Sequence, residues 1–425
     1  MNKLSKSAAD ISQRAIVWGI AAIMLLMPFH AFFSIYLGSI SFNQMLIQPW
    51  KEILILVLSF CWILLCITKR RIYIRPDTTN ILFISIICMS LVVTIFARPA
   101  SEAVLFGVKT NLVAIAIYFI AQIPISSKSF IKKQIHWIVI IPGVIVALIA
   151  ILQSTILPDR LFELLGYNAS NINPRQIVDG SLAFHRAFST LGGPNQLGTY
   201  LIVPLAFSLV YAIKQKKWWL LGLTAVFTIA IGFSFSRSAW IGAVVAVFSA
   251  LLLVFTNRQR IILGSITLIV IISGVIAIPS LIKSNPRLEN VLHHGRVFEN
   301  RIEGSDQSRL EAVSNTTQAV MDQPFGHGLG TAGPASFQLP VPVIPENWYL
   351  QIAYEVGVIT LLLYIFAFAG LMGDFIRHRK SELAASLFAL TCGILVANLF
   401  LHSWADSTLA LVVFSLYGLY KGRTA

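Results

Sequence analysis

Long apolar stretches separated by polar connections run through the whole chain. Each is about twenty residues long, enough for a helix to cross about 30 Å of hydrocarbon at about 1.5 Å per residue. The pattern predicts an all-α fold, a polytopic transmembrane bundle of about twelve helices. The predicted spans are residues 15–36, 48–68, 79–97, 102–122, 136–156, 196–213, 218–235, 237–256, 261–283, 349–373, 383–400 and 404–420.

Two long connections divide the chain. We expect spans 1–5 within residues 1–156, a first outer loop over 157–195, spans 6–9 within 196–283, a large outer loop over 284–348, and spans 10–12 within 349–425. The first span is long, has no small-residue cleavage site at its end and is followed by another span. We therefore expect a retained helix rather than a signal peptide.

Positive charge marks every second connection, which by the positive-inside rule places both termini in the cytoplasm and both long loops outside. The net charge of +14 is spread over these short connections. It forms no single patch, so no nucleic-acid partner is expected. The basic residues are Lys3, Lys6 and Arg14; Lys69, Arg70, Arg71 and Arg75; Lys128, Lys132 and Lys133; Lys214, Lys216 and Lys217; Arg258 and Arg260; Arg377, Arg379 and Lys380; and Lys421 and Arg423.

The composition agrees with a membrane protein and excludes a soluble domain. Hydrophobic residues make up 56% of the chain and charged residues 12%, and the mean hydropathy is +0.78, far from the usual balance of a globular domain. The four cysteines all fall inside predicted spans and form no CxxC pair. Neither a disulfide framework nor a zinc site is indicated.

The positive-inside rule does not account for the arginines on the outer side, so they need another explanation. Arg237, in FSFSRSAWIG, lies where two spans meet with almost no connection, and Arg186 precedes a Gly-Gly-Pro-Asn turn that ends at Asn195. A guanidinium stays charged at low dielectric and can bind a pyrophosphate through bidentate hydrogen bonds. The alternatives are solvated loop surface and a snorkelling anchor at the interface.

The large outer loop contains a weakly amphipathic segment and a glycine-rich segment. Residues 308–321 have roughly helical apolar spacing, with Asp306 as the expected N-cap, which predicts a helix on the membrane surface. FGHGLGTAG follows, and its glycines allow either close approach of a ligand or simply a sharp turn. Because of these neighbours, His327 is a candidate substrate contact, whereas His293, His294 and His402 are weaker rivals.

Glu346 and Asn347 stand at the mouth of the following apolar run, in VIPENWYLQIAYEVG. An unpaired polar group at a membrane boundary is expensive. One interpretation is that these two residues cap the helix. The other is that Glu346 is a general base in a partly desolvated site, and one residue can do both.

Several segments together carry a family resemblance: SFSRSAWIG, then SRLEAV, QPFGHGLG and ENWYLQIAYEVGVITLLLY. Over about residues 185–370 the chain resembles the O-antigen ligase and O-antigen polymerase family. The resemblance implies a bacterial inner-membrane enzyme that takes a glycan from undecaprenyl diphosphate at the outer face and passes it to a glycan, lipid or protein acceptor. It also implies inversion at the anomeric carbon without a metal or other cofactor, and the eight aspartates form no Asp-x-Asp pair.

The resemblance and the expected chemistry assign roles. Negative charge grows on the diphosphate as it leaves, so Arg237 and Arg186 are the candidates to stabilise it, and Glu346 is the candidate base. In the ligases of this family a histidine commonly precedes the Asn-x-x-Leu motif, and here Glu346 replaces it. The candidate substrate-binding residues are Asn347, His327, Arg309 and Asn195.

The alternative function is a lipid-linked glycan flippase or transporter, which would also suit about twelve spans. Transporters usually show internal repeats and ionisable residues at mid-membrane. Only Lys109 and Glu355 look deep, and no repeat is evident. The large asymmetric outer loop and its arginines favour an enzyme over both a transporter and a purely structural scaffold.

Overall fold

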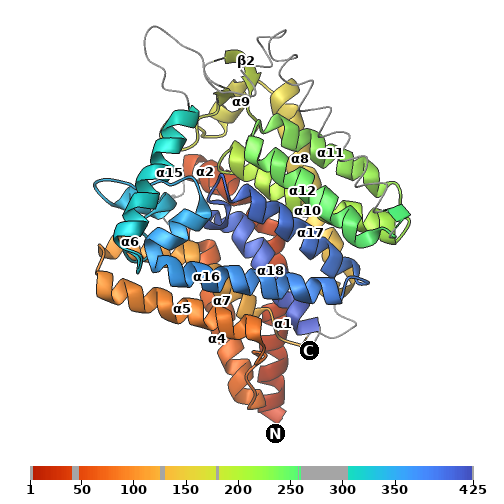
Figure 1. Ribbon diagram of the computed structural model, residues 1–425. Helices are drawn as coiled ribbons and strands as arrows, with labels where there is room; N and C mark the ends of the chain where they lie inside the picture. Colours follow the sequence, from red (N-terminus) through yellow and green to blue (C-terminus); the bar gives the residue numbers. More distant parts are fainter. Residues whose placement is uncertain are drawn as a thin grey trace.

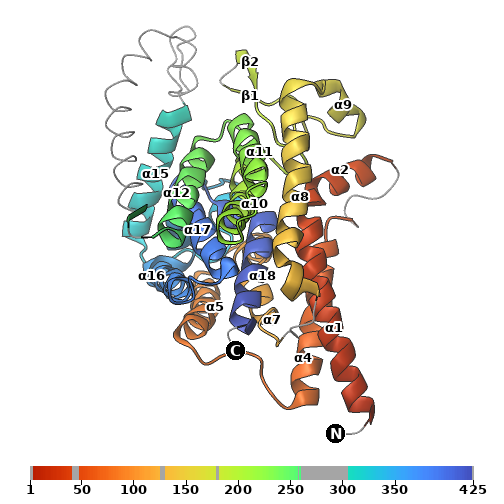
Figure 2. The ribbon, with the colours of Figure 1, turned by 90° about the vertical axis from the view of Figure 1, so that its right-hand side faces the viewer.

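The computed structural model describes residues 3–40, 47–124, 130–178, 181–256, 258–259 and 305–423. Within these ranges the chain is almost entirely helical (Figures 1 and 2). Among the described residues, eight helices are long and apolar enough to cross a membrane, and two shorter ones are also apolar. The predicted all-α membrane architecture is confirmed in this sense. The predicted span 261–283 lies outside the described residues, and each of the other predicted spans overlaps helical residues. Two of them are divided: span 15–36 falls on α1, η1 and α2, and span 102–122 on α6 and α7.

The described chain contains two strands and a series of helices. The antiparallel strands are β1 (Ile177–Val178) and β2 (Ser181–His185). The helices are α1 (Lys3–Leu26), η1 (Met27–Phe29), α2 (His30–Ile40), α4 (Trp50–Lys69), α5 (Thr78–Ala97), α6 (Ser101–Asn111), α7 (Val113–Ile120), α8 (Phe130–Thr155), α9 (Asp159–Leu164), α10 (Pro194–Lys214), α11 (Leu220–Phe233), α12 (Arg237–Val254), α15 (Ser305–Asp322), η2 (Gly333–Gln338), α16 (Trp348–Arg377), α17 (Glu382–Ala397), η3 (Ser403–Ala405) and α18 (Ser407–Arg423).

The centre of the bundle is α10, which is buried along almost its whole length. It packs against α8, α11, α12 and α17. The contact between α12 and α17 depends on small residues: a Cβ on Gly393 would lie 2.4 Å from the carbonyl oxygen of Gly242. Small residues of this kind let helix backbones approach closely where the hydrophobic effect gives little drive for association.

Helix α16 is broken at Gly357, whose φ is +85°. A break inside a membrane helix leaves backbone groups that need partners. The glycine-rich segment supplies them: His327 N donates to Tyr354 O at 2.8 Å, Gly328 N donates to Glu355 O at 2.7 Å, and Val358 N donates to Pro324 O at 2.9 Å. The loop and the broken helix therefore form one unit.

The basic connections gather at one end of the bundle. Lys214 Nζ donates to Lys380 O at 2.9 Å, and Lys421 Nζ pairs with Asp77 at 3.0 Å and also with Asp374. Both chain ends lie in the lower half of Figures 1 and 2, whereas α9, α15 and the strands lie in the upper half. This grouping agrees with the alternation that the charge pattern predicts.

The helix predicted over residues 308–321 is present as α15. One detail was wrong: Asp306 lies within the described helix α15 and is not its N-cap. Acidic residues favour both positions, because each places negative charge near the partly positive helix N-terminus. The sequence pattern alone does not separate the two.

Candidate functional site

Two clefts meet at the end of the bundle opposite the basic connections. The first, which we call the apolar cleft, has a volume of about 520 Å³. Its walls come from the start of α12, the first half of α15, the residues before α16 and the connection after α17. The lining residues are Arg237, Ser238, Ile241, Arg309, Leu310, Val313, Glu346, Asn347, Leu399 and Phe400.

Four predicted site residues line the apolar cleft, and three of them, Arg237, Arg309 and Glu346, are charged. Arg309, from α15, donates through Nε to Glu346 Oε2, which lies just before α16. The two side chains are 30% and 37% exposed, respectively, so solvent screens the pair and its contribution to stability is small. Arg237, the first residue of α12, lines the same cleft. Two guanidinium groups and one carboxylate therefore face an otherwise largely apolar space.

Asn347, not Glu346, caps helix α16. Its Oδ1 accepts from Leu350 N at 3.0 Å, and its Nδ2 donates to Leu399 O at 3.0 Å. The capping interpretation thus holds for Asn347. Glu346 has a φ of +47°, a left-handed conformation that is uncommon for a residue with a side chain, although Arg70 and Arg98 also adopt it at helix ends. This conformation accompanies the pairing of Glu346 with Arg309.

The second, or polar, cleft has a volume of about 280 Å³ and shares Glu346 with the first. It is formed by the starts of α4, α10 and α18, the end of α6, η2 and the connection between α17 and α18. The lining residues are Lys51, Lys109, Thr110, Asn195, Gln196, Thr199, Pro334, Glu346, Leu401, His402, Ser403, Ala405, Asp406 and Ser407.

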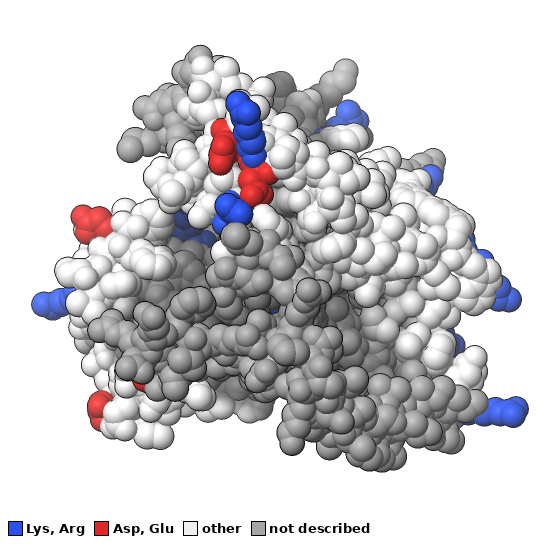
Figure 3. All heavy atoms as spheres, turned by 90° about the horizontal axis from the view of Figure 1, so that it is seen from above, with Lys and Arg blue, Asp and Glu red and all other residues white. Residues whose placement is uncertain are grey.

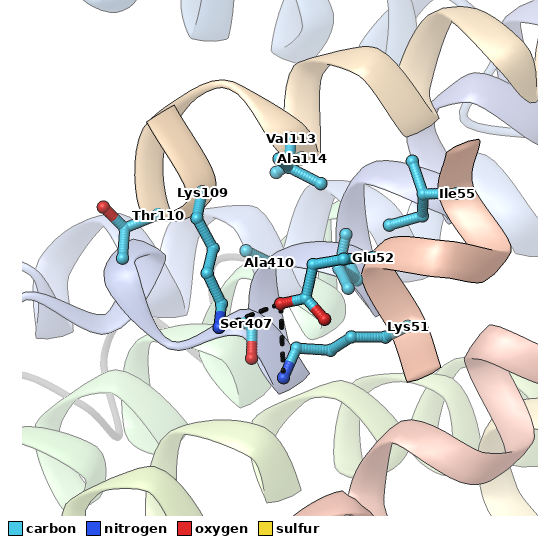
Figure 4. A pocket seen from close by; sticks show the side chains of 10 residues that line it. Lys51, Glu52, Ile55, Lys109, Thr110, Val113, Ala114, Ser407 and Ala410 are labelled. Atoms are coloured by element: carbon cyan, nitrogen blue, oxygen red, sulfur yellow. Dashed lines mark ion pairs between the residues drawn. The ribbon is translucent and has the colours of Figure 1, made fainter. Parts of the chain in front are cut away.

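A charged group lies at the α4 and α6 side of the polar cleft. Lys109 Nζ pairs with Glu52 Oε1 at 2.9 Å, and Lys51 Nζ lies 3.8 Å from the same oxygen. Figure 4 shows both lysine side chains directed at Glu52, close to Ser407. Sequence reasoning identified Lys109 as deep but missed Lys51 and Glu52. The available signal was a pair of opposite charges at the outer start of a predicted span.

Arg186 and Asn195 lie together, away from the apolar cleft. The Arg186 guanidinium donates to Ser234 O at 3.2 Å and to Asn195 Oδ1 at 3.0 Å. Asn195 lines the polar cleft, whereas Arg186 is not among the residues that line either cleft. Arg186 thereby connects the first outer loop to the start of α10 and to the turn that carries Arg237.

His327 is not brought to either cleft. Its ring stacks on that of Tyr354 with centroids 4.0 Å apart. The glycines around it approach the protein itself: a Cβ on Gly330 would lie 1.8 Å from Ala103 O, and one on Gly326 2.6 Å from Gly357 N. The sharp-turn interpretation of this segment is therefore favoured, and a role for His327 in substrate binding has no geometric support here.

His402, a weaker rival in the sequence, does line the polar cleft. Burial lowers the pKa of its imidazole, the nearby Arg309 lowers it further, and Glu346 partly opposes both. The desolvated ring therefore favours its neutral form. A neutral imidazole offers one donor and one acceptor to a ligand.

Glu355, the other deep ionisable residue, anchors the glycine-rich segment. Its Oε2 accepts from Asn111 Nδ2 at 2.8 Å, and its Oε1 accepts from Ala332 N at 3.3 Å. This carboxylate ties α6 and the loop to α16. The two residues that looked deep in the sequence, Lys109 and Glu355, thus have partners within the described part of the chain.

Surface charge near the first outer loop belongs to a local network. Asp159 lies 3.8 Å from Arg175 and 3.7 Å from His185. Figure 3, seen from above, shows acidic and basic side chains in one small group, with mostly uncharged atoms elsewhere on the described surface of this face. Arg175 is therefore a loop residue with a local partner, and the cleft arginines are the ones that need a functional explanation.

The geometry defines a class of site: two guanidinium groups and a carboxylate at the mouth of an apolar cleft, next to a polar one, in a membrane-helix bundle. Such a site suits an amphiphile with an anionic head.

The chain is also similar to known proteins in two respects. Residues 220–365 match the family model described as O-Antigen ligase. An O-antigen polymerase of Salmonella muenchen is 27% identical over 312 residues, which cover 70% of this chain and 75% of that protein. The resemblance to the O-antigen ligase and polymerase family is confirmed.

Proposed function

We propose that this protein transfers a glycan from undecaprenyl diphosphate to an acceptor hydroxyl at the outer face of the bacterial cytoplasmic membrane. The observation that carries the proposal is the convergence of Arg237, Arg309 and Glu346 at the mouth of the apolar cleft. The family match and the relative named O-antigen polymerase support it. All three residues lie within the matched segment, residues 220–365.

The apolar cleft fits the lipid end of such a donor. Ile241, Val313 and Leu399 offer a surface for the first isoprene units, while Arg237 and Arg309 hold the diphosphate. Guanidinium groups suit this role because they remain charged at low dielectric and bind phosphate oxygens in pairs. The diphosphate thus sits between the lipid and the polar cleft.

Transfer of the glycan then follows from the positions of the charged side chains. The bond between C1 of the sugar and the diphosphate oxygen breaks, and the bonding electrons leave on the diphosphate, where the two arginines stabilise them. The acceptor oxygen attacks C1 from the opposite face, and its proton passes to Glu346. Attack opposite the leaving group inverts the anomeric carbon. This is the inverting, metal-independent reaction that we propose.

The ion pair between Arg309 and Glu346 suggests how binding prepares the base. In the structure Arg309 donates to Glu346. An arriving diphosphate competes for this guanidinium, and once Arg309 turns to it, Glu346 is left available to the acceptor hydroxyl. Arg186 acts at a distance, by holding the turn that carries Arg237 through Ser234.

The test is an assay of the purified protein with an undecaprenyl-diphosphate oligosaccharide, with and without a separate acceptor, read by mass spectrometry. Lengthening of the lipid-linked glycan alone identifies a polymerase, and a requirement for the second acceptor identifies a ligase. NMR of the product should show an inverted linkage. Movement of the intact lipid-linked glycan across sealed vesicles, without consumption of the diphosphate bond, would contradict the proposal and favour a flippase.

A further inference from the structure

Unpaired polar atoms are concentrated in the connection between α17 and α18. Buried polar groups normally have hydrogen-bond partners, and an exception calls for a water, an ion or a ligand. In this connection five buried side-chain atoms have no partner among the described residues, and the residues bearing three of them line the polar cleft: His402, Ser403 and Asp406. The five atoms are Asn398 Nδ2, His402 Nδ1, Ser403 Oγ, Trp404 Nε1 and Asp406 Oδ2.

The two carboxylate oxygens of Asp406 have different surroundings. It immediately precedes α18, and its Oδ1 accepts from Thr408 N at 3.1 Å. Its Oδ2 is buried without a partner among the described residues. One oxygen thus caps the helix, and the other has no partner among the described residues, in a residue that lines the polar cleft.

Two lysines also line this cleft. The Lys51 side chain is only 5% exposed, and that of Lys109 is 38% exposed. Their charges are already balanced, because Glu52 bridges them and Asp406 lies on the same cleft. Glu346 is in turn balanced by Arg309. A cleft with many donors and acceptors but matched charges favours a neutral polyhydroxyl group over a further anion.

We propose that the polar cleft is the subsite for the first sugar of the lipid-linked donor, bound through its hydroxyl groups by Asp406 and Lys109. This inference rests on the proposed function. The geometry supports it because Glu346 lines both clefts. A sugar attached to a diphosphate held by Arg237 and Arg309 extends from this junction into the polar cleft. Asp406 and Lys109 lie outside the family-matched segment of residues 220–365, and in this proposal they contribute to sugar selectivity.

The test compares two probes on the purified protein: undecaprenyl diphosphate, and the undecaprenyl-diphosphate-linked glycan extracted from the bacterium that encodes it. Asp406→Asn keeps the capping oxygen but turns the free acceptor into a donor, and Asp406→Ser keeps a cap but removes the second oxygen. We expect each variant to weaken binding of the glycan-bearing lipid about tenfold and to leave binding of undecaprenyl diphosphate unchanged. Lys109→Gln should act in the same direction.

The control is Asp322→Asn, at an exposed position at the end of α15 outside both clefts, which should bind both probes as the wild type does. Equal affinity of the wild type for the two probes, or equal losses for both probes in the Asp406 variants, overturns the inference while leaving the proposed transfer intact. Absence of glycan transfer by the wild type refutes the proposed function instead, and the two failures are thereby distinguished.

Discussion

The apolar and polar clefts lie on either side of Glu346 and are built from different kinds of residue. Arg237, Arg309 and Glu346 carry the charge of the apolar cleft, and all fall within the family-matched segment, residues 220–365. The charged residues on the far side of the polar cleft come from α4, α6 and the connection before α18, which lie outside it. Under the two proposals, the apolar cleft carries the transfer chemistry and the polar cleft carries the choice of sugar.

The largest effect is expected from substitution of Arg237, which lines the apolar cleft but not the polar one. Arg237→Ala should reduce the transfer rate by about 100-fold or more, because it removes one of two groups that stabilise the leaving diphosphate. Arg237→Lys should also be impaired, since an ammonium cannot reproduce the bidentate geometry. The measurement is the rate in the purified system, with membrane insertion checked separately. Near-normal turnover of the Ala variant would remove Arg237 from the site.

A smaller effect, on stability rather than chemistry, is expected at Asn347. Asn347→Ala removes the cap of α16 and the bond to Leu399, and should lower the free energy of unfolding by about 1–2 kcal/mol. Asn347→Asp is the matched control, because it keeps a capping oxygen. Thermal denaturation in detergent separates the two variants. Equal melting temperatures for Asn347→Ala and the wild type would show that the cap is unimportant.

A pH effect is expected at His402. Burial lowers its pKa below the ordinary value of 6.5, so the unfolded chain binds a proton there more readily than the folded protein does. The corresponding stability is present above pH 6.5 and is lost as the pH falls from 6.5 through the lowered folded pKa. Thermal melting between pH 7.5 and 5 should therefore fall less for His402→Gln than for the wild type. Parallel pH profiles would contradict this assignment.

No effect is expected from removal of divalent metals. Guanidinium groups supply the positive charge in the proposed reaction, so EDTA should leave the transfer rate unchanged. Inhibition by EDTA that added Mg²⁺ reverses would overturn the metal-independent mechanism and would require a different explanation of the apolar cleft.

Much of the fold was accessible from the sequence, because apolar periodicity and charge alternation act locally. They predicted helices where the structure has them, including α15 over residues 308–321. Local reasoning also identified Arg237, Glu346 and Asn347, because polar residues at the ends of apolar helices are costly and stand out. Arg309 became a candidate through the family resemblance. The structure brings these four residues to one cleft.

The rest depended on long-range packing. The charged group of Lys51, Glu52 and Lys109 forms only when α4 meets α6. The glycines near His327 suggested room for a ligand, but they fit against the break in α16 at Gly357. That break could not be predicted from a single glycine in an apolar run. The same applies to Asp406, whose free oxygen becomes visible only in the assembled cleft.

The most direct test of the central claim is the single-turnover transfer rate of Glu346→Gln, with Glu311→Gln as the control. Both variants neutralise a carboxylate, but Glu311 is an exposed residue of α15 that does not line the apolar cleft. The account predicts that Glu346→Gln loses about 10²-fold or more in rate while folding is retained, and that Glu311→Gln is unchanged. Unaltered turnover of Glu346→Gln would show that this carboxylate is not the base.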